Sequence, residues 1–396
     1  MQLVNGAILQ QQENLVPMDF TDDYRASGAV RAHQLPLPAR ADVIAAVEAV
    51  LSVSPDVVDQ SMTALAAGRH LIFYGPPGTG KTSIAKALAD AYGCEAITHT
   101  ASADWTPFET AGGLQLNFEN GVESMKPHAG IITSAIVACL NHVAAEMAGE
   151  STDYKAAWLV IDEINRANID AAFGPYFNAL DADHPTVALP FMDEPRKVID
   201  VPARFRVIGT MNTYDKNFLF RLSYALTRRF ALIELGVPDN DDEVARDRER
   251  TALLMAVRST LALHNIMKSD DDVAVGYEVA LSLVYQRLVR QIRSTGEQGL
   301  HRGIGFAQIA AALSQAGLAY ELGYGEPGSD HDRLIDAVDR AVVGTIVPQL
   351  EGLPSSRLKD FVAWWESDTE VQALRRSLAG TKALISGLDL FLADAD

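Results

Sequence analysis

Residues 75–82 read Gly75-Pro76-Pro77-Gly78-Thr79-Gly80-Lys81-Thr82, and Ser83 follows. The spacing is G-x-x-x-x-G-K-S/T, directly after a short apolar run and directly before a helical pattern. Glycines let successive backbone N–H groups converge on phosphate oxygens, and the helix points its positive N-terminus at the same place. Lys81 adds a cation, and the Thr82 hydroxyl is a hard oxygen ligand for Mg²⁺. The motif predicts a phosphate-binding loop rather than an ordinary glycine-rich turn.

An acidic pair follows a second apolar run. Trp158–Ile161 is continuous, as is typical of a strand covered on both faces, and it ends in Asp162 and Glu163. In open α/β sheets, ligands bind at the carboxyl ends of the strands. We expect Asp162 to hold Mg²⁺ with Thr82, and Glu163 to orient or deprotonate an attacking water. Alone, the pattern is as often a solvated strand end, but downstream of a phosphate loop it predicts a hydrolytic site.

Two further polar positions fit this chemistry. Asn212 ends the apolar stretch that begins at Phe205, where an amide can hydrogen-bond both a γ-phosphate and a water; a turn residue is the alternative. Arg228 and Arg229 come just before the next apolar run. An arginine there can reach a neighbouring subunit's nucleotide, an effect worth about 10³–10⁵ in rate where it operates. The alternative is a solvated basic turn.

Apolar runs alternate with helical patterns, which predicts a parallel α/β sheet. The expected strands are Leu71–Tyr74, Ala96–Thr100, Trp158–Ile161, Phe205–Gly209 and Ala231–Leu235. Two hairpins interrupt them, one turning at Asn120-Gly121 and one between Val187 and Val201. The expected helices of the second half are 243–264, 276–294, 304–322, 330–350 and 356–392. We therefore expect a tail or linker at 1–40, an α/β domain at 41–238, a helical lid at 239–350 and a helical extension at 351–396.

Composition limits the class of protein. Hydrophobic residues make up 48% and charged residues 21%, which excludes disorder, collagen and a disulfide scaffold. With 33 basic and 52 acidic residues the net charge is −19, so most of the surface repels nucleic acid and anionic lipid. Cys94 and Cys139 form no CxxC pair, which fits a reduced cytoplasm, and no histidine pair predicts a structural metal. We expect no signal peptide, and Pro127–Ala145 is too polar to span a membrane.

Together these blocks resemble the AAA+ ATPases. The resemblance is to the branch containing McrB-type restriction motors and dynein-related domains, related to MoxR-type ATPases, and it covers about 41–320. Its most telling fragment is Ile161-Asp162-Glu163-Ile164-Asn165-Arg166-Ala167-Asn168. Met211-Asn212-Thr213 with Asp215, and Ala225-Leu226-Thr227-Arg228-Arg229-Phe230, also look like this branch.

The resemblance implies a P-loop NTPase core with a five-stranded parallel sheet, an all-α lid and a helical tail. It implies a ring of subunits, usually a hexamer, that binds ATP, or GTP as in McrB, with Mg²⁺ at the interfaces. By position, Gly75–Thr82 is Walker A, Asp162 with Glu163 is Walker B, and Asn212 is the first sensor. Arg228 or Arg229 is the trans arginine, and Arg302 is the candidate second sensor. Asn165 and Arg166 match the branch's polar motif at the subunit interface.

The chain departs from the family in places. Ser223 and Thr227 stand where the pattern D-x-A-L-R-R-R-F has Asp and a third Arg, which leaves the choice of finger open. Gly174-Pro175 should kink the helix after the acidic motif. Near the first hairpin, the candidates for gripping a substrate are Trp105, Phe108, Phe118 and Lys126, and a local core is the alternative.

Three functions follow. The first is a McrB-like motor subunit that drives an effector or nuclease partner in a restriction or defence system, reaching nucleic acid only through that partner or a pore. The second is a MoxR-like chaperone that remodels protein complexes, which the acidic surface suits. The third is a nucleotide-gated scaffold with negligible turnover. The intact set of candidate hydrolytic residues argues against it, namely Lys81, Asp162, Glu163 and Asn212. The first two are cytoplasmic, without a membrane partner.

Overall fold

A computed structural model describes residues 32–51, 53–119, 122–176, 180, 186–188, 198–213, 226 and 228–393. The chain divides into two compact units. The first, an α/β unit, comprises Met1–Gly75 and Lys81–Glu234, and the second, a helical unit, comprises Leu235–Asp396 together with the short loop segment Pro76–Gly80. Most of the tail expected at 1–40 lies outside the described residues.

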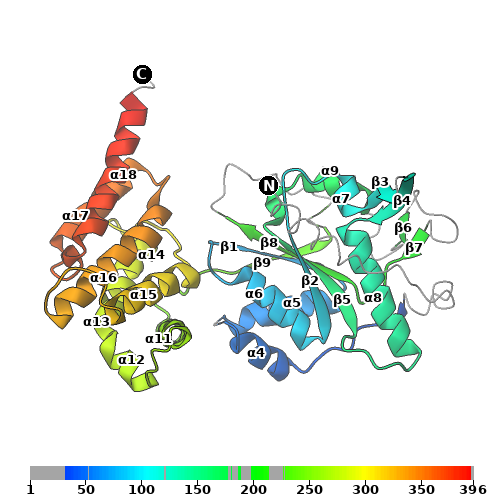
Figure 1. Cartoon of the computed structure of the whole chain (residues 1–396), viewed down its shortest axis with the longest axis horizontal. Helices are drawn as coiled ribbons and strands as arrows, with labels where there is room; N and C mark the ends of the chain where they lie inside the picture. Colours follow the sequence, from blue (N-terminus) through cyan, green and yellow to red (C-terminus); the bar gives the residue numbers. More distant parts are fainter. Residues whose placement is uncertain are drawn as a thin grey trace. The chain divides into compact units, whose positions relative to one another are not determined.

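The α/β unit is built on a five-stranded sheet in which all strands are parallel (Figure 1). The strand order is β2-β5-β8-β1-β9. The strands are β1 (His70–Gly75), β2 (Cys94–Thr100), β5 (Ala156–Asp162), β8 (Arg206–Asn212) and β9 (Phe230–Glu234). Each overlaps a predicted strand, so the predicted fold class is confirmed.

Helices cover the sheet and bury its central strands. α5 (Pro55–Ala66), α6 (Lys81–Ala91) and α8 (Ile131–Met147) pack against it, and α4 (Arg40–Glu48) packs on α5 and α6. Every residue of β5 from Ala156 to Ile161 is fully buried, as its continuous apolar run predicts. The hydroxyl of Ser54 caps α5 by accepting a hydrogen bond from Asp56 N, and Pro55 is the first helical residue.

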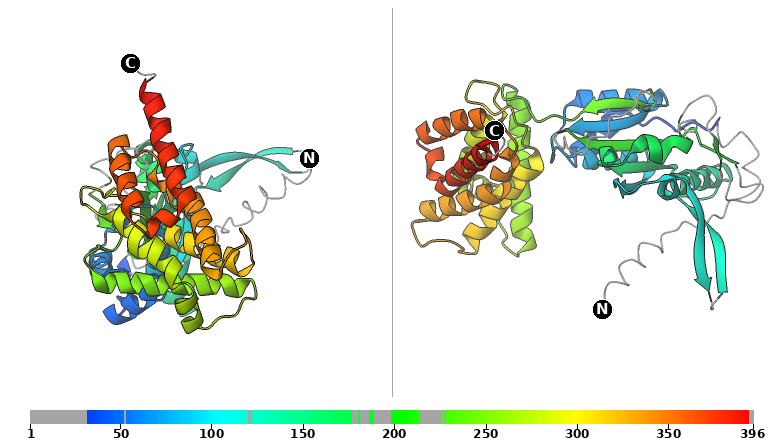
Figure 2. Two further views of the ribbon diagram at one scale, coloured as in Figure 1. Left: turned by 90° about the vertical axis from the view of Figure 1, so that its left-hand side faces the viewer. Right: turned by 90° about the horizontal axis from the view of Figure 1, so that it is seen from above.

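Inserts leave the sheet at two places. After α7 (Pro107–Thr110), the antiparallel strands β3 (Gly112–Glu119) and β4 (Val122–Ala129) form a long hairpin that projects from the α/β unit in the right-hand view of Figure 2. The second pair is β6 (Thr186–Ala188) with β7 (Val198–Asp200), whose connecting residues lie outside the described ranges. Both predicted hairpins are confirmed as strand pairs.

A short irregular segment follows β5. It consists of the 3₁₀ turn η1 (Ile164–Arg166), the helix α9 (Ile169–Phe173) and a second turn η2 (Gly174–Tyr176). α9 ends at Phe173, where Gly174-Pro175 was expected to interrupt it, because proline has no N–H for the helix.

The helical unit contains a succession of helices and turns. They are α11 (Glu243–Leu263), α12 (Asp270–Gly276), α13 (Glu278–Leu281), the π-helical segment η4 (Ser282–Val289), α14 (Arg290–Arg293), α15 (Phe306–Glu321), α16 (Asp330–Thr345), η5 (Val347–Leu350), α17 (Ser355–Ser367), η6 (Val371–Ala373) and α18 (Arg375–Ala393). Within the described ranges, no helix has the length and apolar character needed to cross a membrane.

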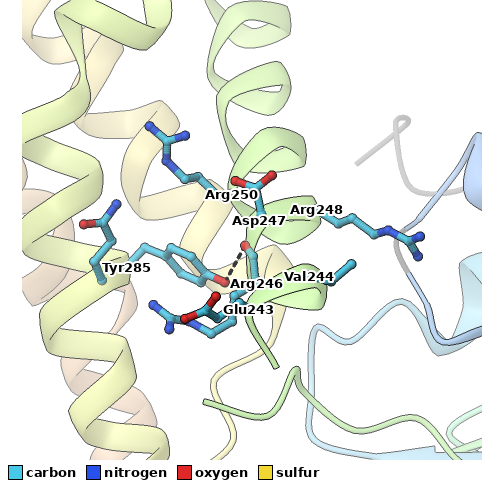
Figure 3. A pocket seen from close by; sticks show the side chains of 8 residues that line it. Glu243, Val244, Arg246, Asp247, Arg248, Arg250 and Tyr285 are labelled. Carbon is cyan, nitrogen blue, oxygen red and sulfur yellow. Dashed lines mark hydrogen bonds between the residues drawn. The ribbon is translucent and has the colours of Figure 1, made fainter. Parts of the chain in front are cut away.

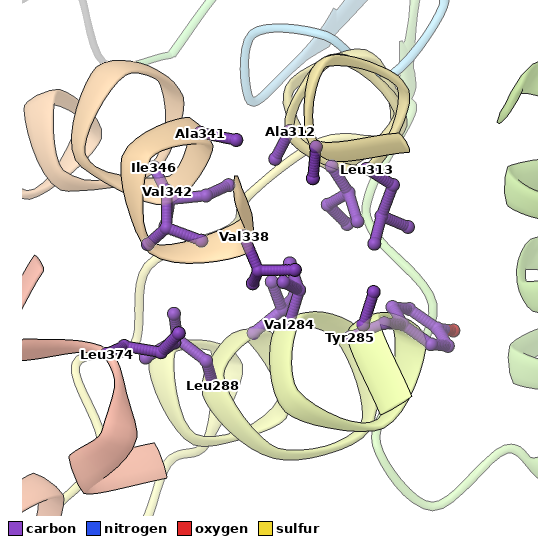
Figure 4. Close-up of a cluster of buried hydrophobic side chains, with 14 of the residues drawn as sticks. Val284, Tyr285, Leu288, Ala312, Leu313, Val338, Ala341, Val342, Ile346 and Leu374 are labelled. Carbon is purple, nitrogen blue, oxygen red and sulfur yellow. The ribbon is translucent and has the colours of Figure 1, made fainter. Parts of the chain in front are cut away.

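One hydrophobic core serves the whole helical unit (Figure 4). It joins side chains such as Leu288 and Val338 to Phe361 and Trp365 of α17 and to Leu374, so the core continues past the boundary expected at residue 350. The single helix expected at 356–392 is broken into two, because the Asp368 carboxylate accepts hydrogen bonds of 3.0 Å from Glu370 N and Val371 N and turns the chain there.

Candidate active site

The candidate site lies where β1, β5 and β8 end. In the sheet, β8 pairs with β1 on one side and with β5 on the other, and Gly75 stands opposite Asn212. Parallel pairing therefore brings together the carboxyl ends of the three strands that carry the predicted motifs. This edge is the usual ligand-binding edge of an open α/β sheet.

The loop between β1 and α6 has the backbone that its glycines predict. Gly78 and Gly80 have φ values of +73° and +86°, a region that is costly for residues with a Cβ. The Lys81 side chain is 6% exposed, and its Nζ donates a 3.1 Å hydrogen bond to the Gly75 carbonyl. Ser83 is half-buried in the first turn of α6. A buried ammonium at the start of a helix is a ready partner for an anion.

Asp162 stands at the centre of a hydroxyl–carboxylate cluster. Its Oδ1 accepts a 2.6 Å hydrogen bond from the Thr82 hydroxyl and a second one from the hydroxyl of Thr210 on β8. Thr82 and Asp162 are the two predicted Mg²⁺ ligands, and the structure brings them into direct contact. Hydroxyl and carboxylate oxygens suit Mg²⁺, which usually takes one or two protein ligands plus substrate phosphates and water. The donor set therefore fits the ion.

Glu163 is held by several partners at once. Its backbone N donates a 3.0 Å hydrogen bond to Thr210 Oγ1. On the side chain, Oε1 accepts a 2.9 Å bond from Asn212 Nδ2, and Oε2 lies 2.6 Å from Arg166 Nε. Glu163 also has a φ of +53°, which is uncommon for a non-glycine residue. The structure thus joins the predicted base and the predicted sensor amide, and it adds Arg166.

The predicted arginines lie in different settings. Arg228 is exposed, and Arg229 is half-buried with its carbonyl accepting a 3.1 Å hydrogen bond from His70 N at the start of β1. Ser223, Thr227 and Asp215 lie outside the described residues. Within the helical unit, Arg302 donates from Nε to the Gln349 carbonyl at 3.0 Å. The trans-arginine and second-sensor roles stay predictions.

The gripping candidates lie at or near the β3–β4 hairpin. Trp105 is half-buried, and Phe108 stacks on His128 with ring centroids 5.1 Å apart. Phe118 is 63% exposed, and Lys126 is exposed on β4. Phe108 has a packing partner, as expected if these aromatic residues form a local core, whereas Phe118 extends into solvent.

Thr210 is a site residue that the sequence reasoning missed. It is 1% exposed and contacts both acidic residues. A signal was present, because Thr210 precedes Asn212 by two positions and successive residues of a strand alternate between faces. If Asn212 faces the site, Thr210 on the same strand face does too.

A cavity of about 640 Å³ lies in the helical unit, between α11 and η4 (Figure 3). Arg246, Asp247 and Arg250 line it, and the Tyr285 hydroxyl donates to the Arg246 carbonyl at 3.1 Å. Two of its charged groups pair with protein partners: Arg250 with Glu278 at 2.7 Å, and Arg246 with the Asn240 carbonyl at 3.2 Å. None of the residues predicted for catalysis or nucleotide binding lines this cavity, so it is separate from the candidate active site.

Comparison with known proteins supports the candidate active site at the ends of β1, β5 and β8. Residues 70–230 match a family model described as AAA domain, dynein-related subfamily. No curated protein matches the chain. The match spans β1 to the start of β9 and includes the whole cluster from Gly75 to Asn212. Residues 70–230 therefore form an AAA domain, which indicates nucleotide binding and hydrolysis, typically with Mg²⁺.

Proposed function

We propose that this chain hydrolyses ATP at the edge formed by β1, β5 and β8, and works as a McrB-like motor subunit. The observation that carries the hydrolytic assignment is the 2.6 Å contact between Thr82 and Asp162, supported by the 2.9 Å contact between Asn212 and Glu163. Residues that are far apart in the sequence lie together at this edge. Their side chains suit the three tasks of phosphoryl transfer, which are phosphate binding, metal binding and orientation of the attacking water.

Each residue has a role that follows from its chemistry. Lys81 and the loop amides bind the outer phosphates, and Thr82 and Asp162 hold the metal. Bound Mg²⁺ neutralises charge on the phosphate oxygens. Glu163 orients or deprotonates the attacking water, and Asn212 fixes the carboxylate that does so. We name ATP rather than GTP as the substrate only because the wider AAA+ family uses ATP.

The motor role extends further than the site. Following the family, we propose a ring, with Arg228 or Arg229 reaching the nucleotide of the neighbouring subunit and an effector or nuclease partner supplying the second activity. The alternative is a MoxR-like chaperone for protein complexes. One observation favours it: Leu114, Leu116, Phe118 and Met125 are each 48–63% exposed on the β3–β4 hairpin, an apolar surface that suits a protein client.

Two variants test the hydrolytic assignment. Glu163→Gln should bind ATP with unchanged affinity and lose turnover by about 10²–10⁴-fold, because only the base is removed. Lys81→Ala should lose nucleotide binding, measured by calorimetry. Wild-type turnover in the first variant, or wild-type affinity in the second, would refute the assignment. A pull-down with Glu163→Gln from the native host then separates a nuclease partner from a remodelled protein complex.

A further inference from the structure

The cavity of the helical unit has charged residues that play no part in the proposed hydrolysis. Its volume of about 640 Å³ lies within the range of about 300–1,000 Å³ found for small-molecule sites. Charged residues line it from one face of α11, and polar residues line it from η4 (Figure 3). The first set is Glu243, Arg246, Asp247 and Arg250, and the second is Tyr285 and Gln286.

Arg246 is a half-buried guanidinium without a charged partner. Among the residues that the structure describes, the one hydrogen bond of its side chain goes from Nη1 to the neutral Asn240 carbonyl at 3.2 Å, and no carboxylate pairs with it. Partly buried charges are usually paired, because water compensates them only in part. Arg246 therefore has N–H donors and charge left for an anion in the cavity.

Arg250 lies one turn further along the same face of α11. Its Nη2 binds Glu278 at 2.7 Å, but its Nε is buried and has no hydrogen-bond partner within the described part of the chain. A buried N–H without a partner costs free energy. Residues four apart are neighbours on a helix surface, so a single oxyanion can reach both arginines.

The opposite wall is a π-helix, a rare structure that is often found at functional sites. η4 is π-helical over eight residues, which is longer than the usual single turn. The Tyr285 hydroxyl lies 3.1 Å from the Arg246 carbonyl and 2.8 Å from Glu249 Oε2, so it ties η4 to α11. Arg293 binds both oxygens of Glu249, at 2.8 and 2.9 Å, so the charge of Glu249 does not counter that of Arg246.

The remaining carboxylates limit what the cavity can accept. Glu243 and Asp247 are exposed, and the net charge of the chain is −19. A polyanion such as nucleic acid would meet these negative charges together with the arginines, so the charge balance disfavours it. A small molecule with one anionic group avoids most of this repulsion.

We propose that the cavity between α11 and η4 binds a small molecule that carries a single carboxylate or phosphate group. Arg246 and Arg250 bind the anionic group, and the half-buried Gln286 hydrogen-bonds the rest of the molecule. Carboxylate and phosphate present the same chemistry to arginine, which is an oxyanion with adjacent acceptors. The inference goes beyond the proposed function, because this site requires neither ATP nor turnover.

Modification by phenylglyoxal, read by mass spectrometry, measures the reactivity of each arginine in the full chain. The probes are inorganic phosphate and acetate, with chloride at equal ionic strength as the blank. At about 50 mM, either probe should slow the modification of Arg246 about fivefold, which corresponds to a Kd of about 12 mM. Arg258 lies on the same helix, outside the cavity, and pairs with Asp270, so its rate should not change.

The outcomes separate the possible ligands. The small anion that protects Arg246 more strongly identifies the anionic group. Equal rates at Arg246 with both anions and with chloride overturn the proposal, as does equal protection of Arg258. A short acidic peptide is the third probe. Protection by the peptide and by neither small anion would indicate a protein partner and overturn the small-molecule assignment.

Arg246→Gln tests the same site through Arg250. The lost charge-assisted hydrogen bond should raise the phosphate concentration that half-protects Arg250 about tenfold or more. The matched variant Arg258→Gln breaks a pair outside the cavity and should leave this concentration unchanged. An unchanged value in folded Arg246→Gln overturns the role of Arg246. If that variant does not fold, the wild-type measurement decides alone.

A repeat in Lys81→Ala separates this site from the phosphate loop. Lys81 does not line the cavity, so Arg246 should be protected as in the wild type. Loss of protection would place the anion at the loop and overturn the proposal. If Arg246 is protected and the wild-type chain neither binds nor hydrolyses ATP, only the proposed function is wrong.

Discussion

Replacing Thr210 with valine tests the central cluster most directly. Valine has nearly the same shape, so packing under the sheet edge is kept and only the hydroxyl is lost. That hydroxyl donates to Asp162 Oδ1 and accepts a 3.0 Å hydrogen bond from Glu163 N. Thr210 is 1% exposed, so water cannot replace it. The change therefore loosens the proposed metal ligand and leaves a buried N–H without its partner.

The magnitude follows from the lost bonds. A hydrogen bond to a charged group contributes about 1.5–3 kcal/mol. At about 1.4 kcal/mol for each factor of ten, this corresponds to roughly a 10–100-fold loss, the range found when an outer-shell partner of a metal ligand is removed. We therefore expect the Mg²⁺ concentration for half-maximal ATP hydrolysis to rise about 10–100-fold in Thr210→Val.

The assay is a Mg²⁺ titration of ATP hydrolysis, with nucleotide affinity in EDTA measured alongside. Thr133→Val is the matched control, because Thr133 is a fully buried threonine of the same unit whose hydroxyl binds the Ala111 carbonyl at 2.6 Å. It should lose stability without shifting the Mg²⁺ midpoint. A folded Thr210→Val protein with a wild-type midpoint would refute the role of Thr210 and the metal assignment of Asp162 with it.

Two further predictions concern β1 and the arginines. Burial, followed by the charges of Arg206 and Arg229, lowers the pKa of His70 from 6.5 to about 3. Between these two pH values, His70 is protonated in the unfolded chain and neutral in the folded chain. The contribution of His70 to the free energy of unfolding is therefore complete above pH 6.5 and falls by about 1.4 kcal/mol per pH unit toward pH 3. The free energy of unfolding, measured with urea, should fall from pH 6.5 to pH 5 by about 2 kcal/mol less in His70→Gln than in the wild type. An equal fall in both proteins would contradict the pKa shift. For the trans role, Arg228→Ala or Arg229→Ala subunits are mixed with Glu163→Gln subunits; the finger is the arginine whose loss lowers hydrolysis at its neighbour, and no effect from either would remove both candidates.

Much of the fold is encoded locally. The loop motif and the apolar runs each involve residues close together in the chain, so their patterns predicted the strands and the loop between β1 and α6. The predicted bounds differ from the observed ones where a single side chain ends an element. The break between α17 and α18 depends on the Asp368 carboxylate turning back on the next amides, which no hydrophobic periodicity reveals.

The sequence alone determined the parallel α/β architecture, and it located the glycine-rich loop and the acidic pair proposed for the site, because spacing and hydrophobicity are properties of neighbouring residues. Only the tertiary structure decided which groups surround that pair. Thr82, Thr210 and Asn212 reach Asp162 and Glu163 because β5 and β8 are adjacent and α6 begins beside them. Asn165 is 1% exposed and its side-chain amide has no hydrogen-bond partner among the described residues. Only the tertiary structure shows this, because burial and hydrogen bonding depend on residues that are distant in the sequence.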